Sequence, residues 1–157
     1  MSVAIAVETP LSDDVRGLVT ALNETALRLT PREFTHHLTV EQMAGEEMTV
    51  FVARMDGKAV AMGALKRHSG GVGEVKRMYT RLEYQGQGIG KRILAEIEAL
   101  ARREGFVALA LETGNNFDAA LHLYRAAGFV ASGPLLDYPA SPYTAFFQKS
   151  LSVSVPA

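Results

Sequence analysis

One strand–helix–strand unit constrains the fold of this chain more than any other feature of the sequence. Residues 72–80 have a strand pattern, and residues 89–101 place apolar side chains at helical spacing on one face. Residues 106–111 are almost continuously apolar, which is typical of a central strand covered on both sides. A crossover of this length predicts that residues 72–80 and 106–113 pair in parallel, with the helix packed on the sheet.

The region before this unit predicts a short strand and then helices. Residues 3–7 form the expected strand, and Ser12 is a candidate cap for a helix whose apolar positions recur from residue 15 to residue 29. Pro31 interrupts this helix. A second, irregular helical piece is expected to run to about residue 45.

Strand patterns then dominate, apart from one more helix. Residues 49–53 and 60–65 flank Asp56-Gly57, a strong hairpin signal. After the crossover unit, a helix is expected over 119–127, a strand begins at Phe129-Val130, and a last strand covers 144–151. Together these patterns predict an α/β fold with a mixed, mostly antiparallel sheet of about six to seven strands and helices on both faces. No repeat, low-complexity tract or linker divides the chain, so residues 1–157 are expected to form a single domain.

Composition excludes several classes of function. Apolar residues make up 48% and the net charge is −1, so no strong field attracts nucleic acid or an acidic membrane. The absence of cysteine excludes disulfides, thiolate metal sites and a thiol nucleophile. The first seven residues lack the features of a signal peptide, and no apolar run is long enough to span a bilayer. A cytoplasmic protein without bound metal is therefore expected, since its four histidines have no metal-ligand spacing.

The segment Gln85-Gly86-Gln87-Gly88-Ile89-Gly90-Lys91 is the most informative for function. It connects a strand to an amphipathic helix, and its glycines allow a sharp turn and the close approach of a ligand. The unpaired N–H groups of the first helical turn favour an anion, which would also explain the cations Lys91 and Arg92 at this position. The segment predicts a diphosphate site; the alternative is a tight strand–helix connection without a ligand.

Two other phosphate-binding motifs do not fit this segment. A P-loop ending in Gly90-Lys91 needs glycine at position 85 and serine or threonine at 92, where Gln85 and Arg92 stand. A Rossmann fingerprint needs glycine at 91 or 93, depending on where it starts, and these positions hold Lys91 and Ile93.

The pattern Gln85-x-x-Gly88-x-Gly90 is similar to the Gln/Arg-x-x-Gly-x-Gly/Ala motif of the GNAT acetyltransferases. The downstream segment 123–129, Leu-Tyr-Arg-Ala-Ala-Gly-Phe, resembles the Leu-Tyr-x-x-x-Gly-Phe segment of the same superfamily. Residues 74–79 and 111–114 further resemble a bacterial branch of small GNAT proteins, many of unassigned substrate. The resemblance covers residues 48–151 well and the N-terminal third in outline.

This resemblance implies acetyl-CoA as cosubstrate and a splayed central parallel pair of strands that receives its pantetheine arm. Main-chain groups of Met78, Tyr79 and Thr80 would then hold pantetheine. The diphosphate would be held by the turn, namely Gln85, Gly86, Gln87, Gly88, Gly90 and Lys91.

The reaction implied is direct attack of an acceptor amine on the thioester. An alkylamine has a pKa near 10, so only about one molecule in a thousand is neutral at pH 7 and a base is useful. Tyr124 matches the family tyrosine that acts as the acid on the CoA sulfur; the alternative is core packing on a shared helical face. An N–H of Met78 or Tyr79 is the expected donor to the thioester carbonyl oxygen.

Glu74 is the candidate base, since several family branches place a carboxylate near this position. The alternatives are an ordinary exposed strand glutamate beside Lys76, and a water chain that replaces the base. Glu112 is interpreted as a strand-end charge rather than a catalyst. Asn115 and Asn116 are candidates for contact with the CoA arm, although the usual family position holds Phe117, and Asn116 could instead cap the next helix.

The leading interpretation is an acetyl-CoA-dependent N-acetyltransferase that acts through a ternary complex on a small-molecule or peptide amine. The alternative is a non-catalytic acyl-CoA-binding sensor or partner module. Fold analogy does not identify the acceptor. The sequence leaves the oligomeric state open; a homodimer is one possibility, since dimers are common among the relatives. The proline-rich loop 133–143 could shape the acceptor pocket, pack across a dimer or form a rigid surface turn.

Overall fold

The computed structural model describes residues 2–29, 39–115, 117–134, 136 and 141–151. In these residues seven strands form one sheet in the order β1-β2-β3-β4-β5-β7-β6. The strands are β1 (Val3–Val7), β2 (Met48–Met55), β3 (Lys58–Arg67), β4 (Val72–Thr80), β5 (Ala108–Gly114), β6 (Val130–Ser132) and β7 (Thr144–Ser150). The helices are α1 (Asp13–Leu29), α2 (Val40–Met43), α3 (Ile89–Arg103) and α4 (Asp118–Ala126).

The N-terminal helix begins where the sequence predicts it. The Ser12 carbonyl accepts the first helical hydrogen bond, from the Arg16 N–H at 2.9 Å, and the Ser12 hydroxyl donates to Asp14. Of the expected second helical piece, α2 is the described part, and a Thr39–Gln42 capping box starts it. Residues 30–38, which include His36 and His37, lie outside the described residues.

The turns follow their local chemistry. Asp56 and Gly57 both have positive φ, 52° and 82°, as the favoured two-residue hairpin between β2 and β3 requires. Helix α3 ends next to Gly105, whose φ of 82° lets the chain leave the helix in the left-handed conformation. β5 starts at residue 108 rather than at the predicted 106, because the Phe106 N–H still donates to the helix carbonyl of Ala101.

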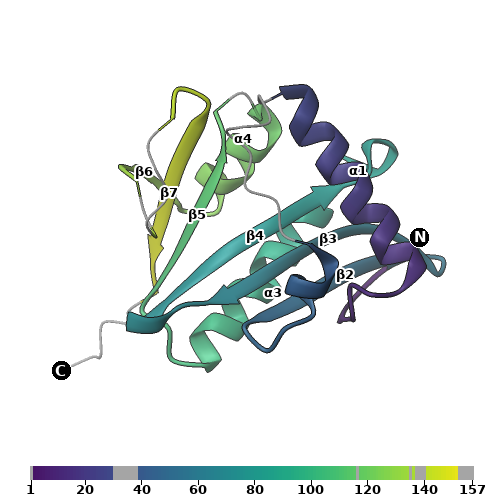
Figure 1. Cartoon of the computed structure of the whole chain (residues 1–157), viewed down its shortest axis with the longest axis horizontal. Coiled ribbons are helices and arrows are strands. Elements are labelled where there is room, and N and C mark those ends of the chain that lie inside the picture. The colour runs from purple at the N-terminus through teal and green to yellow at the C-terminus, as the bar shows by residue number, and fades with distance from the viewer. Residues whose placement is uncertain (1, 30–38, 116, 135, 137–140, 152–157) are drawn as a thin grey trace.

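Helices cover both faces of the sheet, which confirms the predicted architecture (Figure 1). Helices α3 and α4 pack on one face over a core that includes Leu65, Val75, Ile93 and Leu109. Helices α1 and α2 pack on the other face, where Val15, Leu18 and Met43 are among the buried side chains of a second core. We call these the α3 face and the α1 face. In the described residues no helix is both long and apolar enough to cross a membrane.

The central parallel pair separates soon after it forms. β4 and β5 pair only through Val72–Glu74 and Ala108–Ala110, which is shorter than the predicted pairing of 72–80 with 106–113. The remaining parts, residues 75–80 and 111–114, diverge toward the top of Figure 1, and we call the opening between them the fork. A bulge lies in the β4 arm: Arg77 has φ of 57°, and the register with β3 shifts between Met62 and Ala64. The expected splayed pair is therefore present.

Candidate active site

The glycine-rich turn ends in an open helix N-terminus. Gly86 and Gly88 both have φ of 80°, and Gly88 is the N-cap of α3 without a capping side chain. The first helical hydrogen bond runs from the Arg92 N–H to the Gly88 carbonyl at 3.2 Å. The three preceding N–H groups, of residues 89–91, therefore have no acceptor within the helix and are directed along its axis. This arrangement favours an anion such as a diphosphate.

The charges around this turn also favour an anion. Lys91 and Arg92 are exposed, and the first turn of α3 contains no acidic residue. Cations at a helix N-terminus oppose the helix dipole, so a bound anion would relieve this unfavourable interaction. Gln85 has a different role in the structure: its side chain donates to the Thr80 carbonyl at 2.9 Å and its N–H to the Leu82 carbonyl at 3.3 Å. Gln85 thus holds the turn against the end of β4.

Main-chain groups of β4 face the fork beyond the last β4–β5 pair. Tyr79 and Thr80 pair with Met62 and Ala61 of β3, and neither pairs with β5. The edge of β4 that faces β5 is therefore not used by the sheet at Met78, Tyr79 and Thr80. Gly63 lies opposite the bulge on β3, and a Cβ atom there would lie 2.3 Å from the Met78 sulfur, so this part of the sheet is tightly packed on the α3 face.

Tyr124 lies on the α3 face, on α4. Its side chain is buried, with its ring 5.8 Å from that of Phe129 in an edge-on arrangement and 6.5 Å from that of Phe147. Burial raises the pKa of the Tyr124 phenol, so the hydroxyl stays protonated at neutral pH and keeps a proton to donate. The aromatic packing shows that Tyr124 belongs to the core, and this is compatible with a role for its hydroxyl.

Glu74 is a buried member of a charged group on the α1 face. Its side chain is 1% exposed, so the interpretation as an exposed strand glutamate is wrong. One carboxylate oxygen lies 2.8 Å from His68 Nε2, and the other lies 3.1 Å from Lys76 Nζ. Glu74 is the last β4 residue paired with β5, so the group lies at the base of the fork. The buried carboxylate is thus balanced by cationic and hydrogen-bonding neighbours.

Glu112 lies on the same face, two residues beyond the last β5 residue that pairs with β4. Burial, together with the charge of Glu74, raises the pKa of its carboxyl to about 7, and Lys76 opposes this shift. A carboxyl with this pKa exchanges a proton near neutral pH, as a general base must. Sequence reasoning treated Glu112 only as a strand-end charge. Strand alternation could have placed it on one face with Glu74, whereas no sequence signal linked His68 to this group.

Of the two asparagines after β5, the structure describes Asn115 alone. Asn115 is tied to the beginning of β7: its N–H donates to the Tyr143 carbonyl at 2.9 Å and its side-chain amide donates to the Pro142 carbonyl. Asn116 lies outside the described residues. The N-cap of α4 is Phe117, without a side-chain hydrogen bond. Both alternatives for Asn116, contact with the CoA arm and capping of α4, therefore stay predictions.

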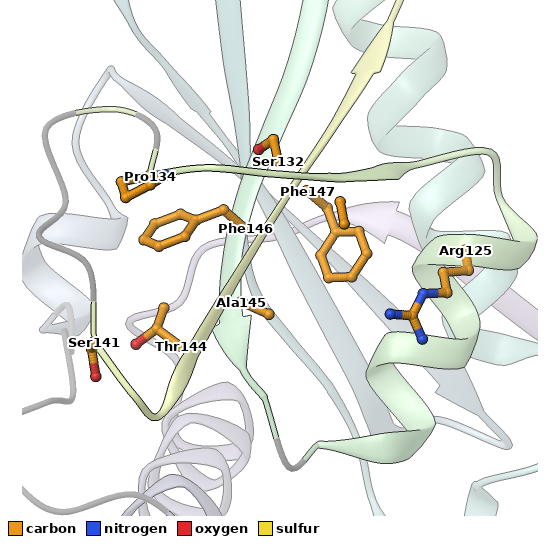
Figure 2. A pocket seen from close by; sticks show the side chains of 9 residues that line it. Arg125, Ser132, Pro134, Ser141, Thr144, Ala145, Phe146 and Phe147 are labelled. Atoms are coloured by element: carbon orange, nitrogen blue, oxygen red, sulfur yellow. The ribbon is translucent and has the colours of Figure 1, made fainter.

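Part of the loop predicted at residues 133–143 lines a cavity of about 290 Å³ beside β6 and β7. Figure 2 shows Pro134 and Ser141 on its loop side and Arg125, from α4, pointing toward Phe147. The Arg125 guanidinium carbon lies 5.4 Å from the centre of the Phe147 ring. Pro134 and Ser141 thus border an open pocket that also contains Arg125, from the helix that carries Tyr124.

Comparison with known proteins identifies the family. The model of the acetyltransferase (GNAT) family matches residues 17–129. An IAA acetyltransferase of Azospirillum brasilense is 39% identical over 151 residues, covering 96% of this chain and 99% of the relative. The uncharacterized N-acetyltransferase YsnE of Bacillus subtilis is 34% identical, with 88% of this chain and 97% of the relative covered. The chain therefore belongs to the GNAT family of acetyltransferases.

Solved structures agree with this assignment. A Klebsiella pneumoniae protein assigned as an acyl-CoA N-acyltransferase superposes with a TM-score of 0.81 at 28% identity, covering 96% of this chain and 98% of that one. The PaiA N-acetyltransferase of Thermoplasma acidophilum, solved with coenzyme A, has the same fold, with a TM-score of 0.72 at 17% identity over 96% of this chain and 99% of the other. The protein is an acetyltransferase that uses acetyl-CoA as its cosubstrate.

Proposed function

We propose that this acetyltransferase transfers the acetyl group directly to an acceptor amine in a ternary complex. The observation that carries the proposal is the fork: an unpaired strand edge beside an open helix N-terminus, with the buried Tyr124 on one face and the buried Glu74 and half-buried Glu112 on the other. Because the chain has no cysteine, the most reactive side-chain nucleophile for an acetyl-enzyme intermediate is missing. Direct transfer needs no such intermediate.

The cosubstrate would lie along the β4 arm of the fork. The backbone N–H groups of residues 86–91 would bind the diphosphate, with Lys91 adding charge and Gln85 holding the turn in place. Main-chain groups of Met78, Tyr79 and Thr80 would bind the pantetheine arm. An N–H of Met78 or Tyr79 would donate to the thioester carbonyl oxygen, where negative charge develops during attack. We assign no CoA contact to Asn115, because its amide is used within the protein.

In the chemical step, the amine nitrogen bonds to the thioester carbonyl carbon and the carbon–sulfur bond breaks. The departing sulfur takes its proton from the Tyr124 hydroxyl, which the raised pKa keeps protonated until that moment. The attacking nitrogen gives up a proton to a carboxylate, directly or through water. Each of these proton transfers typically contributes about 10²–10⁴-fold to the rate.

Two carboxylates of the α1 face compete for the role of base. Both oxygens of Glu74 are engaged, with His68 and with Lys76, which leaves little capacity to accept a proton. The pKa of Glu112, about 7, suits proton transfer at neutral pH. We therefore favour Glu112 as the base, with Glu74 holding Lys76 in position. The variants Glu74→Gln and Glu112→Gln separate these roles, because only loss of the base removes the ionisation from the pH–rate profile.

Calorimetric titration with acetyl-CoA and CoA, followed by a thiol-release screen across amines, tests the proposal. A thiol reagent reports only released CoA, because the protein has no cysteine. We expect acceptor-dependent thiol release, a mass increase of the acceptor by one acetyl group and no acetylated protein in the absence of acceptor. Binding without turnover of any amine would instead support the acyl-CoA sensor. Absence of binding would refute the role of the turn.

A further inference from the structure

The bulge in β4 changes which side chains face α1. Regular alternation would place Arg77 on the opposite face from Lys76. The bulge instead lets both Lys76 and Arg77 point to the α1 face: Lys76 contacts Glu74, and an Arg77 terminal nitrogen donates to the Asn23 side-chain carbonyl of α1. Arg77 adopts φ of 57°, which is strained for an arginine, and bulges of this kind re-aim side chains beside active sites.

The Arg77 guanidinium lacks a counter-ion within the described part of the chain. Among these residues Lys76 is paired with Glu74, whereas Arg77 makes no ion pair, and Asn23 provides only a neutral oxygen. The Arg77 Nε is buried and has no hydrogen-bond partner there. Burial lowers the pKa of the guanidinium to about 10, so it remains charged at neutral pH. A buried, charged donor left unsatisfied is costly, and such groups are normally paired.

We propose that Arg77 binds a carboxylate on the acceptor, so that the acceptor is a small amine that also carries a carboxylate group. A guanidinium presents parallel N–H donors in one plane, and this geometry matches the two oxygens of a carboxylate. Arg77 directly precedes Met78, whose main chain faces the opening between β4 and β5. A carboxylate held by Arg77 would therefore keep the amine of the same molecule close to the thioester. This inference rests on the proposed transfer to an amine.

The proposal also explains the charge pattern of the α1 face. Glu74 and Glu112 place carboxyl groups at the base of the fork, next to Lys76 and His68, and a carboxylate can accept a hydrogen bond from an acceptor amine. Arg77 adds, on the β4 arm, a cation without a counter-ion in the part of the chain that the structure describes. An acceptor with both an amine and a carboxylate complements both parts, whereas a simple alkylamine leaves Arg77 unpaired.

The test compares free L-amino acids with their C-terminal amides, which lack the carboxylate. Because the amide group also lowers the pKa of the α-amine, kcat/KM is calculated per neutral amine for both substrates. For the wild-type protein we expect kcat/KM for the acids to exceed that for the amides. Arg77→Gln should lower kcat/KM for the acids by about 10²-fold, mainly through KM, and leave the amides nearly unchanged. Arg81→Gln is the matched control, because Arg81 has its own acceptor in the Ala59 carbonyl. Equal use of acids and amides, or equal losses in both variants, would overturn the proposal.

A second variant covers the case in which Arg77→Gln fails to fold. Asn23→Asp adds a counter-ion at the atom that already accepts from Arg77. Asn23→Asp should stabilise the free protein and lower kcat/KM for the amino acids but not for the amides, because the new carboxylate pairs with the Arg77 guanidinium. Stabilisation with an unchanged kcat/KM for the amino acids would contradict the proposal.

Failure of acetyl transfer itself is distinguished by binding. Thermal shifts with acid and amide in the presence of CoA need no turnover. If the protein binds acids better than amides but transfers nothing, the proposed function fails and the Arg77 site stands. If acids bind no better than amides, the Arg77 proposal fails whatever the turnover.

Discussion

The two faces of the sheet differ in what they bury around the fork. On the α3 face, Val75, Leu109 and Leu111 pack with α3 and α4, and Tyr124 is the titratable side chain among the buried residues of this core. On the α1 face the same two strands carry Glu74, Lys76 and Glu112, and Arg77 reaches α1. One pair of strands therefore presents an apolar surface to one side and charges to the other.

This difference suggests a division of the reaction between the two faces. In the proposed reaction, the α3 face would support the cosubstrate turn and supply the protonated Tyr124 phenol to the leaving sulfur. The α1 face would supply the charged groups that bind the acceptor and take up its proton. Substitutions on the α3 face should therefore affect the stability of the protein, the binding of acetyl-CoA and the departure of its sulfur. Changes on the α1 face should affect pH dependence and acceptor choice.

The largest effect is expected where the α3 face is most tightly packed. Gly63→Val would place side-chain atoms against Met78 Sδ at 2.3 Å and Ile93 Cγ2 at 2.7 Å, as judged from the position of a Cβ. Overpacking of this kind should lower the free energy of unfolding by about 3 kcal/mol, measured by urea denaturation. Gly17→Ala, in α1, is the contrasting variant: its Cβ meets only Arg81 at 3.6 Å, and it should stabilise by about 0.5–1 kcal/mol. Equal destabilisation by the two variants would show that the sheet at Gly63 is no more tightly packed than α1 at Gly17.

Tyr124→Phe tests the chemical role of the α3 face. The ring contacts with Phe129 and Phe147 remain, so stability and acetyl-CoA affinity should change little. Loss of the hydroxyl should lower kcat by about 10²-fold if it protonates the leaving sulfur. Phe129→Leu is the matched control and should reduce stability by about 1 kcal/mol without a selective loss of kcat. Unchanged turnover in Tyr124→Phe would leave this residue a packing role only.

The two ends of α3 offer a matched pair for the cosubstrate turn. Gly88 and Gly105 have φ of 80° and 82°, and a Cβ atom added at either position would meet no described atom within 4 Å, so alanine experiences the same backbone strain at both. Each variant should lose about 1 kcal/mol of stability. Only Gly88→Ala should weaken acetyl-CoA binding, by about tenfold in calorimetry, because it distorts the N-terminal anion site. Equal affinities in the two variants would argue against that site.

A pH dependence near neutrality is expected on the α1 face. The pKa of Glu112 is about 7 in the folded protein and close to 4.5 in the unfolded chain, so between these values only the folded form holds the proton. The free energy of unfolding should therefore fall as pH rises from about 4.5 to 7 and level off above that. Glu112→Gln should flatten this slope in urea midpoints at several pH values. It should also remove the rise of kcat/KM through pH 7; persistence of both slopes would assign them to another group.

Most of the fold was predictable because its signals are local. The hairpin at Asp56-Gly57, the apolar face of α3 and the glycine at its end each follow from the conformational preferences of a few neighbouring residues. The β4–β5 pairing ends at Glu74, earlier than predicted, and β4 then bulges against β3 at Arg77. No residue type near these positions signals either feature.

The candidate site was predictable only in part. The glycine-rich turn and Tyr124 belong to short sequence motifs, so they could be named as candidate site residues from the sequence. Glu112 is separated from Glu74 by many residues and His68 by a turn, and only the sheet brings both next to the buried Glu74.

By itself, the sequence determined the family, the order of strands and helices, and the segment suited to bind a diphosphate, since each is encoded in contiguous residues. The tertiary structure decided which charges lie together and, among the described residues, that the Arg77 guanidinium has no counter-ion. The physical reason is that burial, pKa and counter-ions depend on neighbours from other strands. In this protein those neighbours assemble only at the fork, where β4 leaves β5 and Arg77 turns toward α1.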